Sequence, residues 1–446
     1  MESPWLLPRR IEHFVKRIPL ISRTGASRYG IHRPLYFQYD AQGINLYGCT
    51  YVYLLAALFF VFPPSIVLAR GLSATLGFST GVLLGLLATK ISHRKSIGIM
   101  VALTTMLTPW LFEISRIVLE QVVYQLVLVL FLLALYRAHK HPRWSMLDGA
   151  LLAHTLALVT YTYATGKLLG PAFAFGLLFF ATTRRRLMDV IKTWAMFALT
   201  LIPLVVFNMH HPGALQARFH ELTYVTPQST IRQIAVEFTP RYLTNLNVIR
   251  WVYIGDANPR HHVPGAMGSL LGATVVVALS CPCPRVAHPW WCYILFGLAL
   301  SLAPGALTRD NFHAREIAFA IFLIVLNIPT LEWFLESEGN RNQGRREGDG
   351  WAAAGRPALS LALMVCTVVQ AAYFQMKFRQ EGPKRGYAFE SDFAPVFAAA
   401  TALPNRPIYL VREPATICAY WYATVQRRSI AQFAEVPVEK SLRGEL

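Results

Sequence analysis

Long hydrophobic runs separated by short polar segments make up most of this chain. Each run is nearly free of charge and, with tilt and flanking residues, is long enough for an α-helix of roughly 20 residues to cross a bilayer. Ten spans are predicted at 71–89, 97–112, 121–136, 145–166, 168–183, 187–208, 265–284, 286–304, 317–334 and 357–374. Another apolar stretch, 47–68, is interrupted by Pro63 and Pro64 and predicts either a further crossing or an interfacial helix. The pattern therefore predicts an all-α polytopic membrane protein with about 10–11 apolar helices.

The remaining segments predict three regions. Residues 1–46 are basic and aromatic and contain no span, and residues 47–377 form the multi-span domain, including a long outer loop at 209–263. Residues 378–446 are mixed: Arg406–Arg412 is typical of a strand and Ala415–Val425 of a helix, so we expect a small extracytoplasmic α/β segment.

Composition supports the membrane class. The chain is 54% hydrophobic and 15% charged, whereas soluble domains are about 25% charged. A net charge of +18 could indicate nucleic-acid binding, but the basic residues cluster in short loops between apolar runs, which is the membrane-orientation pattern. We therefore expect no nucleic-acid partner.

The loops alternate in charge along the chain. One set carries fourteen basic residues: Lys90, Arg94, Lys95, Arg137, Lys140, Arg143, Arg184, Arg185, Arg186, Arg285, Arg341, Arg345, Arg346 and Arg356. The short loops of the other set carry four: Arg116, Lys167, Arg309 and Arg315. The positive-inside rule places the first set in the cytoplasm. It predicts a multi-pass protein of the plasma (inner) membrane, with the second set, residues 209–263 and the C-terminal segment facing outward.

Candidate chemistry begins between the second and third predicted spans. Glu113, Arg116 and Glu120 are spaced i, i+3 and i+7, so on one continuous helix they would share a face. Two interpretations stay open: charges that mark helix ends at the membrane surface, or part of a site.

Other outward segments are also rich in basic residues. Lys167 closes a hairpin that begins at Tyr161, Arg260 and His261 lie near the end of the long loop, and His313 and Arg315 lie in a later hairpin. These groups could bind lipid headgroups or be solvated. Alternatively, they form one basic pocket for a phosphate, which arginine binds through paired hydrogen bonds. In that case Arg260 and His261 lie close to Arg116 and Lys167.

Four segments, in this order, resemble the integral-membrane glycosyltransferases of the GT-C fold, the group that includes dolichyl-phosphate-mannose protein mannosyltransferases and the lipid A aminoarabinose transferase. The similar motifs are Arg33-Pro-Leu-Tyr-Phe with Asn45–Ala57, Thr108-Pro-Trp with Ser115-Arg116 and Glu120, Tyr161-Thr-Tyr with Gly166-Lys167, and Gly255–His261 with His313-Ala-Arg315. The resemblance extends from about Pro34 to Tyr422.

The resemblance implies an inverting transfer of a sugar from a polyprenyl-phosphate donor lipid to an acceptor hydroxyl. Its donor-phosphate candidates are Arg116, Lys167, Arg260, His261, His313 and Arg315. A carboxylate base is also required, and Asp40 and Glu120 are the candidates. No cofactor and no metal site are predicted, because the sequence has no metal-ligand cluster, although a divalent cation is compatible with the superfamily.

One departure from the family affects the expected activity. Members of the family have a first span followed by an Asp or an Asp-Glu pair. In residues 1–46 there is no span and no Asp-Glu pair, and Asp40 lies downstream of the position expected for the acid. We therefore expect a truncated or inactive chain that binds the donor without full turnover, with Glu120 paired to Arg116. The alternatives are a transporter or flippase for a lipid-linked or anionic solute, and a non-catalytic membrane scaffold.

Overall fold

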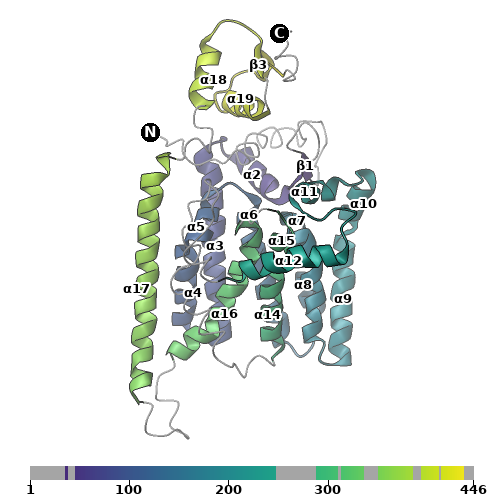
Figure 1. The fold of residues 1–446 in the computed structure, drawn as a ribbon, viewed down its shortest axis with the longest axis vertical. Helices are drawn as coiled ribbons and strands as arrows, with labels where there is room; N and C mark the ends of the chain where they lie inside the picture. The colour runs from purple at the N-terminus through teal and green to yellow at the C-terminus, as the bar shows by residue number, and fades with distance from the viewer. Residues whose placement is uncertain are drawn as a thin grey trace.

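The computed structural model of this protein describes residues 36–38, 46–247, 288–309, 313–335, 350–384, 393–410 and 413–435. Long helices run side by side in a bundle, and a small α/β module lies beyond one end of it (Figure 1). The predicted all-α polytopic fold with a C-terminal α/β appendage is confirmed.

Most helices of the bundle pack against the helix that precedes or follows them in the chain, as α3 does against α4 and α6 against α7. The bounds are α3 Ile66–Ser92, α4 Lys95–Leu107, α5 Pro109–Arg116, α6 Glu120–Lys140, α7 Met146–Thr162, α8 Gly166–Gly176 with the 3-10 turn η1 Leu177–Phe180, α9 Arg184–Thr200, α10 Ile202–His210, α14 Pro289–Ser301, α15 Ala303–Ala306, η4 His313–Glu316, α16 Ile317–Leu335 and α17 Gly350–Glu381.

Six helices among the described residues are long and apolar enough to cross a membrane. They are Ile66–Ser92, Glu120–Lys140, Arg184–His210, Pro289–Ala306, Ile317–Leu335 and Leu361–Glu381. The predicted span 97–112 is not straight: α4 and α5 meet at 62° because Thr108, held extended before Pro109, interrupts the helix. Helices α7 and α8 are shorter and pack in the same bundle, and the predicted span 265–284 lies outside the described residues.

The stretch 47–68 does not form one crossing. Helix α2, Cys49–Val61, has 13 residues and ends before Pro63, so it is about 20 Å long and too short for a hydrocarbon core of about 30 Å. It lies at one end of the bundle (Figure 1). The strands that precede it, β1 Tyr36–Gln38 and β2 Leu46–Gly48, pair in antiparallel fashion. The structure therefore favours the interfacial alternative.

Small residues bring α3 and α4 into backbone contact. A Cβ atom on Gly98 would lie 2.7 Å from the carbonyl oxygen of Gly85 and would clash with Oγ1 of Thr89. Such close approach of helices is common in membranes, where van der Waals packing replaces the hydrophobic effect.

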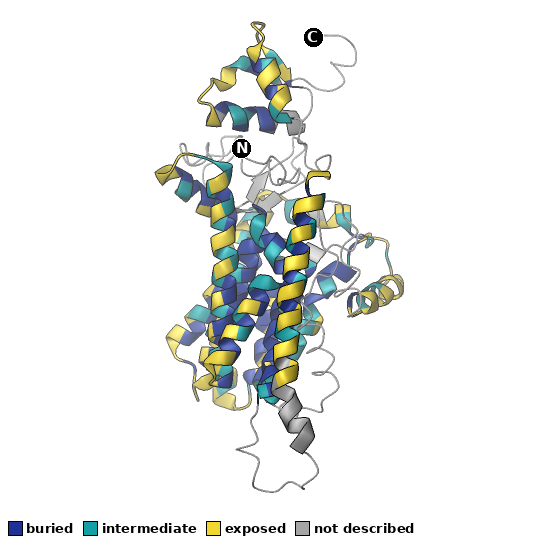
Figure 2. Ribbon diagram, turned by 90° about the vertical axis from the view of Figure 1, so that its left-hand side faces the viewer, coloured by how far each residue is buried: buried dark blue, intermediate teal, exposed yellow. Residues whose placement is uncertain are grey.

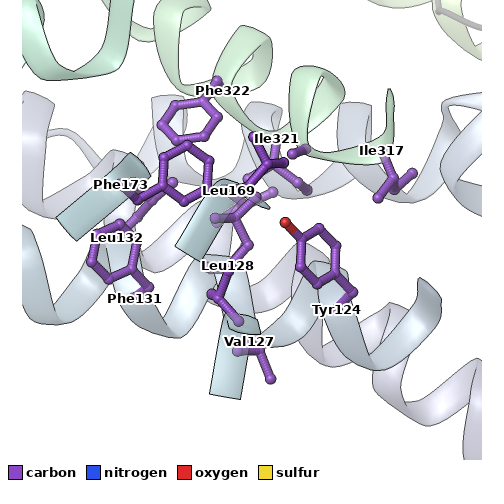
Figure 3. Close-up of a cluster of buried hydrophobic side chains, with 14 of the residues drawn as sticks. Tyr124, Val127, Leu128, Phe131, Leu132, Leu169, Phe173, Ile317, Ile321 and Phe322 are labelled. Carbon is purple, nitrogen blue, oxygen red and sulfur yellow. The ribbon is translucent and has the colours of Figure 1, made fainter. Parts of the chain in front are cut away.

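Aromatic rings fill the centre of the bundle, where α6, α8 and α16 meet (Figure 3). The rings of Phe131 and Phe173 stack at 6.1 Å, and Phe322 lies 5.3 Å from Phe173. The Tyr293 hydroxyl donates to the Phe173 carbonyl at 3.1 Å, which joins α14 to this cluster. In contrast, α17 is largely exposed along its length (Figure 2), as expected for a helix that faces lipid.

The C-terminal module has its own small core. Its elements are α18 Phe393–Ala402, β3 Ile408–Leu410, α19 Glu413–Val425, η7 Ile430–Gln432 and β4 Phe433–Glu435. Strands β3 and β4 pair in parallel, and Phe397 packs against Phe433 at 5.9 Å. Trp421 reaches the bundle and lies 6.4 Å from Phe59 of α2. The predicted strand and helix of this region are confirmed.

We call the end of the bundle where α6 begins the Glu120 end and the opposite end the Lys140 end. The α3–α4, α6–α7 and η1–α9 turns, which carry the predicted cytoplasmic charges, lie together at the Lys140 end (Figure 1). Lys167 and Arg315 belong to the opposite end. The predicted separation of the two loop sets is therefore visible in the described residues.

Candidate functional site

The segment with Glu113, Arg116 and Glu120 is not one helix. Helix α5 ends at Arg116, Ile117 and Leu119 are extended, and α6 begins at Glu120. The prediction of one shared helical face is therefore wrong. Two β-branched residues, at 117 and 118, lower helix propensity at this point. The break also places the Glu120 carboxylate in the first turn of α6, where the helix dipole favours negative charge.

Arg116 faces α17. Its guanidinium lies 5.2 Å from the centre of the Phe112 ring and 4.7 Å from that of Phe378 in α17. The charged residues that act on it are Arg379 and Glu113, and the Glu113 side chain is buried. An arginine stacked on aromatic rings is held in place with its N–H edge still able to bind an anion.

Glu120 acts electrostatically on Lys167 of α8. Both residues are at the first turn of their helices, and Glu120 is 4% exposed. The Lys167 ammonium donates to the Leu215 carbonyl at 3.4 Å. Glu113, and not Glu120, is the acidic residue that acts on Arg116, so the expected pairing of Glu120 with Arg116 is not what the described residues show.

Two further helices lie between α10 and α14 in the chain, α11 Ala214–Leu222 and α12 Ile231–Asn245, and α12 runs across the bundle (Figure 1). They occupy part of the predicted outer loop 209–263, so that region is partly helical. Thr223, after α11, donates through Oγ1 to the Leu307 carbonyl at 2.6 Å and pairs with Thr308 in an antiparallel bridge. These contacts fix the loop against the hairpin that follows α15.

That hairpin carries Arg315 and Glu316. Arg315 donates to Oγ1 of Thr308 at 2.8 Å, and Thr308 Oγ1 donates to the Gly305 carbonyl at 2.8 Å. The Glu316 side chain is fully buried, and a Cβ atom on Gly305 would clash with its Oε1 atom. Glycine at 305 is thus required for the carboxylate to approach α15.

Arg241 of α12 holds the same hairpin. Its guanidinium donates to the carbonyls of Thr308 at 3.2 Å and Arg309 at 2.8 Å, and to Glu237 at 3.2 Å. It also lies 5.0 Å from the centre of the Tyr224 ring. Burial raises the pKa of the Tyr224 hydroxyl, and the Arg241 cation opposes this shift.

The structure thus brings three predicted phosphate ligands to one end of the bundle, but on different elements. Arg116 packs against α17, Lys167 against α11, and Arg315 against the turn after α15. Asp40, Arg260 and His261 lie outside the described residues, as does the side chain of His313. Among the residues that are described, no group of three or more His, Cys, Asp or Glu could hold a metal.

Two buried carboxylates at this end were not among the predicted site residues. Glu113 is 5% exposed and Glu316 is fully buried. Each adjoins a long apolar stretch, and a carboxylate in that position is a sequence signal for a buried functional or structural charge.

This arrangement of spans, with charged groups collected at one end and a small module beyond it, is the fold of the GT-C membrane glycosyltransferases. The chain is similar to the crystal structure of ArnT from Cupriavidus metallidurans bound to undecaprenyl phosphate: TM-score 0.60 and 12% identity, over 98% of this chain and 87% of that one. It is also similar to the archaeal oligosaccharyltransferase AglB from Archaeoglobus fulgidus in complex with an inhibitory peptide and a dolichol-phosphate: TM-score 0.55 and 13% identity, over 96% of this chain and 61% of that one.

No protein-family model and no curated protein sequence matches this chain. At this level of identity the likeness defines the fold, so the predicted resemblance to the GT-C group is confirmed for the architecture.

Proposed function

We propose that this protein is a membrane glycosyltransferase that transfers a sugar from a polyprenyl-phosphate donor to an acceptor hydroxyl at the outer face of the plasma membrane. The single observation that carries the proposal is the collection of Arg116, Lys167 and Arg315, from three separate elements, at one end of a GT-C fold. The lipid phosphates in the two similar structures support the same class of donor.

The chemistry requires stabilisation of the departing phosphate more than acid assistance, because a lipid phosphate is a good leaving group. Fixed cations are effective for this purpose since they are oriented before charge develops. Arg116 is held by two aromatic rings and Arg315 by Thr308, so both are positioned in advance. Arg260, His261 and His313 complete the proposed phosphate-binding set.

The acceptor hydroxyl requires a carboxylate base, for which Asp40 and Glu120 are the candidates. The electrostatic interaction of Glu120 with Lys167 favours a charged carboxylate that orients this ammonium over a role as proton acceptor. We therefore assign Glu120 to orienting Lys167. We retain the expectation that residues 1–446 bind the donor without full turnover.

Binding of undecaprenyl phosphate to the purified chain in lipid nanodiscs tests the proposal. We expect saturable binding to the wild type, weaker binding to Lys167→Ala and Arg315→Ala, and unchanged binding to Arg185→Ala, an exposed arginine at the Lys140 end. Equal binding by all four proteins would refute the donor site.

A sugar-transfer assay in membranes then distinguishes the candidate bases. Turnover that is lost in Asp40→Asn and retained in Glu120→Gln would make Asp40 the base and overturn the expectation of inactivity. The reverse result would assign the role to Glu120. Movement of the labelled lipid across the bilayer without sugar transfer would favour the transporter or flippase alternative.

The proposed orientation is tested in intact cells with a thiol reagent that does not cross the membrane. In a background without the six native cysteines, we expect labelling of Arg309→Cys and none of Lys140→Cys. Labelling of position 140 from outside would reverse the orientation.

A further inference from the structure

Arg116 and Arg379 differ from two other arginines of the Glu120 end. Arg241 and Arg315 donate hydrogen bonds to the hairpin that follows α15. In contrast, neither Arg116 nor Arg379 makes a hydrogen bond or an ion pair with any residue that the structure describes. The N–H donors of both guanidinium groups are therefore available to a ligand.

Aromatic packing between α5 and α17 brings these two arginines together. Phe112 of α5 meets Phe374 of α17 edge to face, with ring centres 6.1 Å apart, and Phe374 lies 5.9 Å from Phe378. The Arg116 guanidinium lies over the rings of Phe112 and Phe378. Arg379 follows Phe378 in the last turn of α17, and its charge acts on Arg116. The packing thus holds two guanidinium groups at one contact between helices.

The charged residues described around this contact leave an excess of positive charge. Arg379 acts on Arg116 more strongly than the buried Glu113 does, and its effect is repulsive. Glu381, near the end of α17, forms an ion pair with Lys377 at 3.5 Å. Two like charges held at a packed contact repel each other, and an anion between them is attracted to both. The pair is therefore suited to an anion with more than one negative charge.

The proposed transfer increases the negative charge on the donor phosphate. The bond between the anomeric carbon and the phosphate oxygen breaks, and its electron pair stays on that oxygen. The acceptor oxygen bonds to the anomeric carbon and gives its proton to the carboxylate base. A phosphate diester with a single negative charge thereby becomes a monoester, which carries a charge of about −1.5 to −2 near neutral pH. Cations that are already oriented toward this oxygen stabilise the charge as it develops.

We infer that Arg116 and Arg379 together bind a phosphate monoester, and that Arg379 matches the negative charge that a diester lacks. The lipid phosphate released from the donor is the ligand, since the contact lies at the Glu120 end on α17, a helix that is largely exposed along its length (Figure 2). The inference rests on the proposed function and extends it to Arg379, which favours the departing phosphate over the intact donor.

Affinity measurements with the full chain in phosphatidylcholine nanodiscs test this selectivity. The probes are two monoester lipids, undecaprenyl phosphate and phosphatidic acid, one diester lipid, phosphatidylglycerol, and soluble inorganic phosphate. Arg379→Gln should weaken binding of both monoesters by about tenfold and of the diester by less than about threefold, because a charge-assisted hydrogen bond is lost only where the second charge is present. Lys384→Gln, which removes an exposed charge just beyond α17, should change neither affinity.

Thermal unfolding without a probe verifies that both variant proteins are folded. Arg379 is exposed, so we expect the same unfolding midpoint for Arg379→Gln and Lys384→Gln. Arg379→Lys, which keeps the charge and loses the paired donors, is the second variant if Arg379→Gln does not fold, and should also weaken monoester binding.

The other outcomes separate this inference from the proposed function. Wild-type affinity for both monoesters in Arg379→Gln, with binding still weakened in Lys167→Ala, would overturn the role of Arg379 alone. Equal losses for monoesters and diester would overturn the selectivity. Binding of phosphatidic acid that depends on Arg379, without binding of undecaprenyl phosphate, would support the two-arginine site and refute the donor. Binding of inorganic phosphate but of neither monoester lipid would overturn the lipid ligand, and no binding of any probe would overturn both proposals.

Discussion

The two ends of the bundle use charge differently. At the Lys140 end, Asp148 accepts hydrogen bonds from Arg137 at 3.2 Å, from His141 at 2.9 Å and from the Ser145 hydroxyl at 2.7 Å. These residues are close in sequence, at the end of α6, in the α6–α7 turn and in the first turn of α7. At the Glu120 end, Arg116, Lys167 and Arg315 come from separate elements that are distant in sequence.

The comparison distinguishes charged side chains that stabilise a local turn from charged side chains that are available to bind a ligand. Asp148 and Ser145 form a capping box that starts α7, so the anion satisfies the backbone and its immediate neighbours. Asp148 is buried as well, but at the Glu120 end the buried carboxylates of Glu113, Glu120 and Glu316 lie on three separate elements. Burial of ionisable groups on several helices at a membrane surface is costly and typical of functional sites.

The largest expected effect is at Arg116. Arg116→Ala and Arg116→Lys should each weaken binding of undecaprenyl phosphate by about 10–100-fold, because hydrogen bonds to a charged group contribute about 1.5–3 kcal/mol and lysine lacks the paired geometry. The measurement is binding affinity in nanodiscs, with Arg185→Ala as the control. Wild-type affinity in Arg116→Lys would mean that Arg116 is only a boundary charge and would remove the contrast between the ends.

At the Lys140 end, Asp148→Ala should lower the free energy of unfolding by about 2 kcal/mol, since it removes a helix cap and a charged acceptor. Donor binding should not change, because no predicted ligand lies there. Thermal unfolding in detergent and the binding assay measure the two effects. A change in affinity without loss of stability would show that the ends are coupled.

The close approach of α3 and α4 predicts a loss of similar size. Gly98→Ala places a Cβ atom against Thr89 and the Gly85 carbonyl, and should destabilise by about 1–3 kcal/mol through overpacking. Gly71→Ala in α3 is the matched control, since nothing lies within 4 Å of its added Cβ. Comparison of the two unfolding midpoints separates packing from helix propensity. Equal midpoints would argue against the backbone contact.

The smallest effect concerns how the Glu120 end is assembled. Arg241→Lys should raise amide hydrogen exchange in residues 303–309 by about tenfold, because each lost hydrogen bond to a carbonyl contributes about 1 kcal/mol. Arg232→Lys, at an exposed position on the same helix, should leave exchange unchanged. Unaltered exchange in Arg241→Lys would show that the contacts of Thr223 and Arg315 hold this hairpin without Arg241.

Local pattern was a reliable guide where each residue's neighbours in sequence are also its neighbours in space. The spans 187–208 and 317–334 correspond to Arg184–His210 and Ile317–Leu335, because an apolar run of that length has few alternatives in a bilayer. The strand and helix of the C-terminal module follow the same logic. The interruption at 117–119 was not predicted. The i, i+3, i+7 spacing places residues on one face only if the helix is continuous, and here the helix ends at Arg116 and a new one begins at Glu120.

The sequence by itself determined the all-α membrane class, most span positions and the separation of basic loops, because hydropathy and charge act along the chain. Only the tertiary structure decided which charges meet. Glu113 rather than Glu120 is the acidic neighbour of Arg116, and Arg241 of α12 holds the hairpin of Arg315. Such pairings depend on helix breaks and on packing between segments far apart in the chain. The strength of an electrostatic interaction depends on the distance between the two charges in space, which residue spacing along the chain does not give.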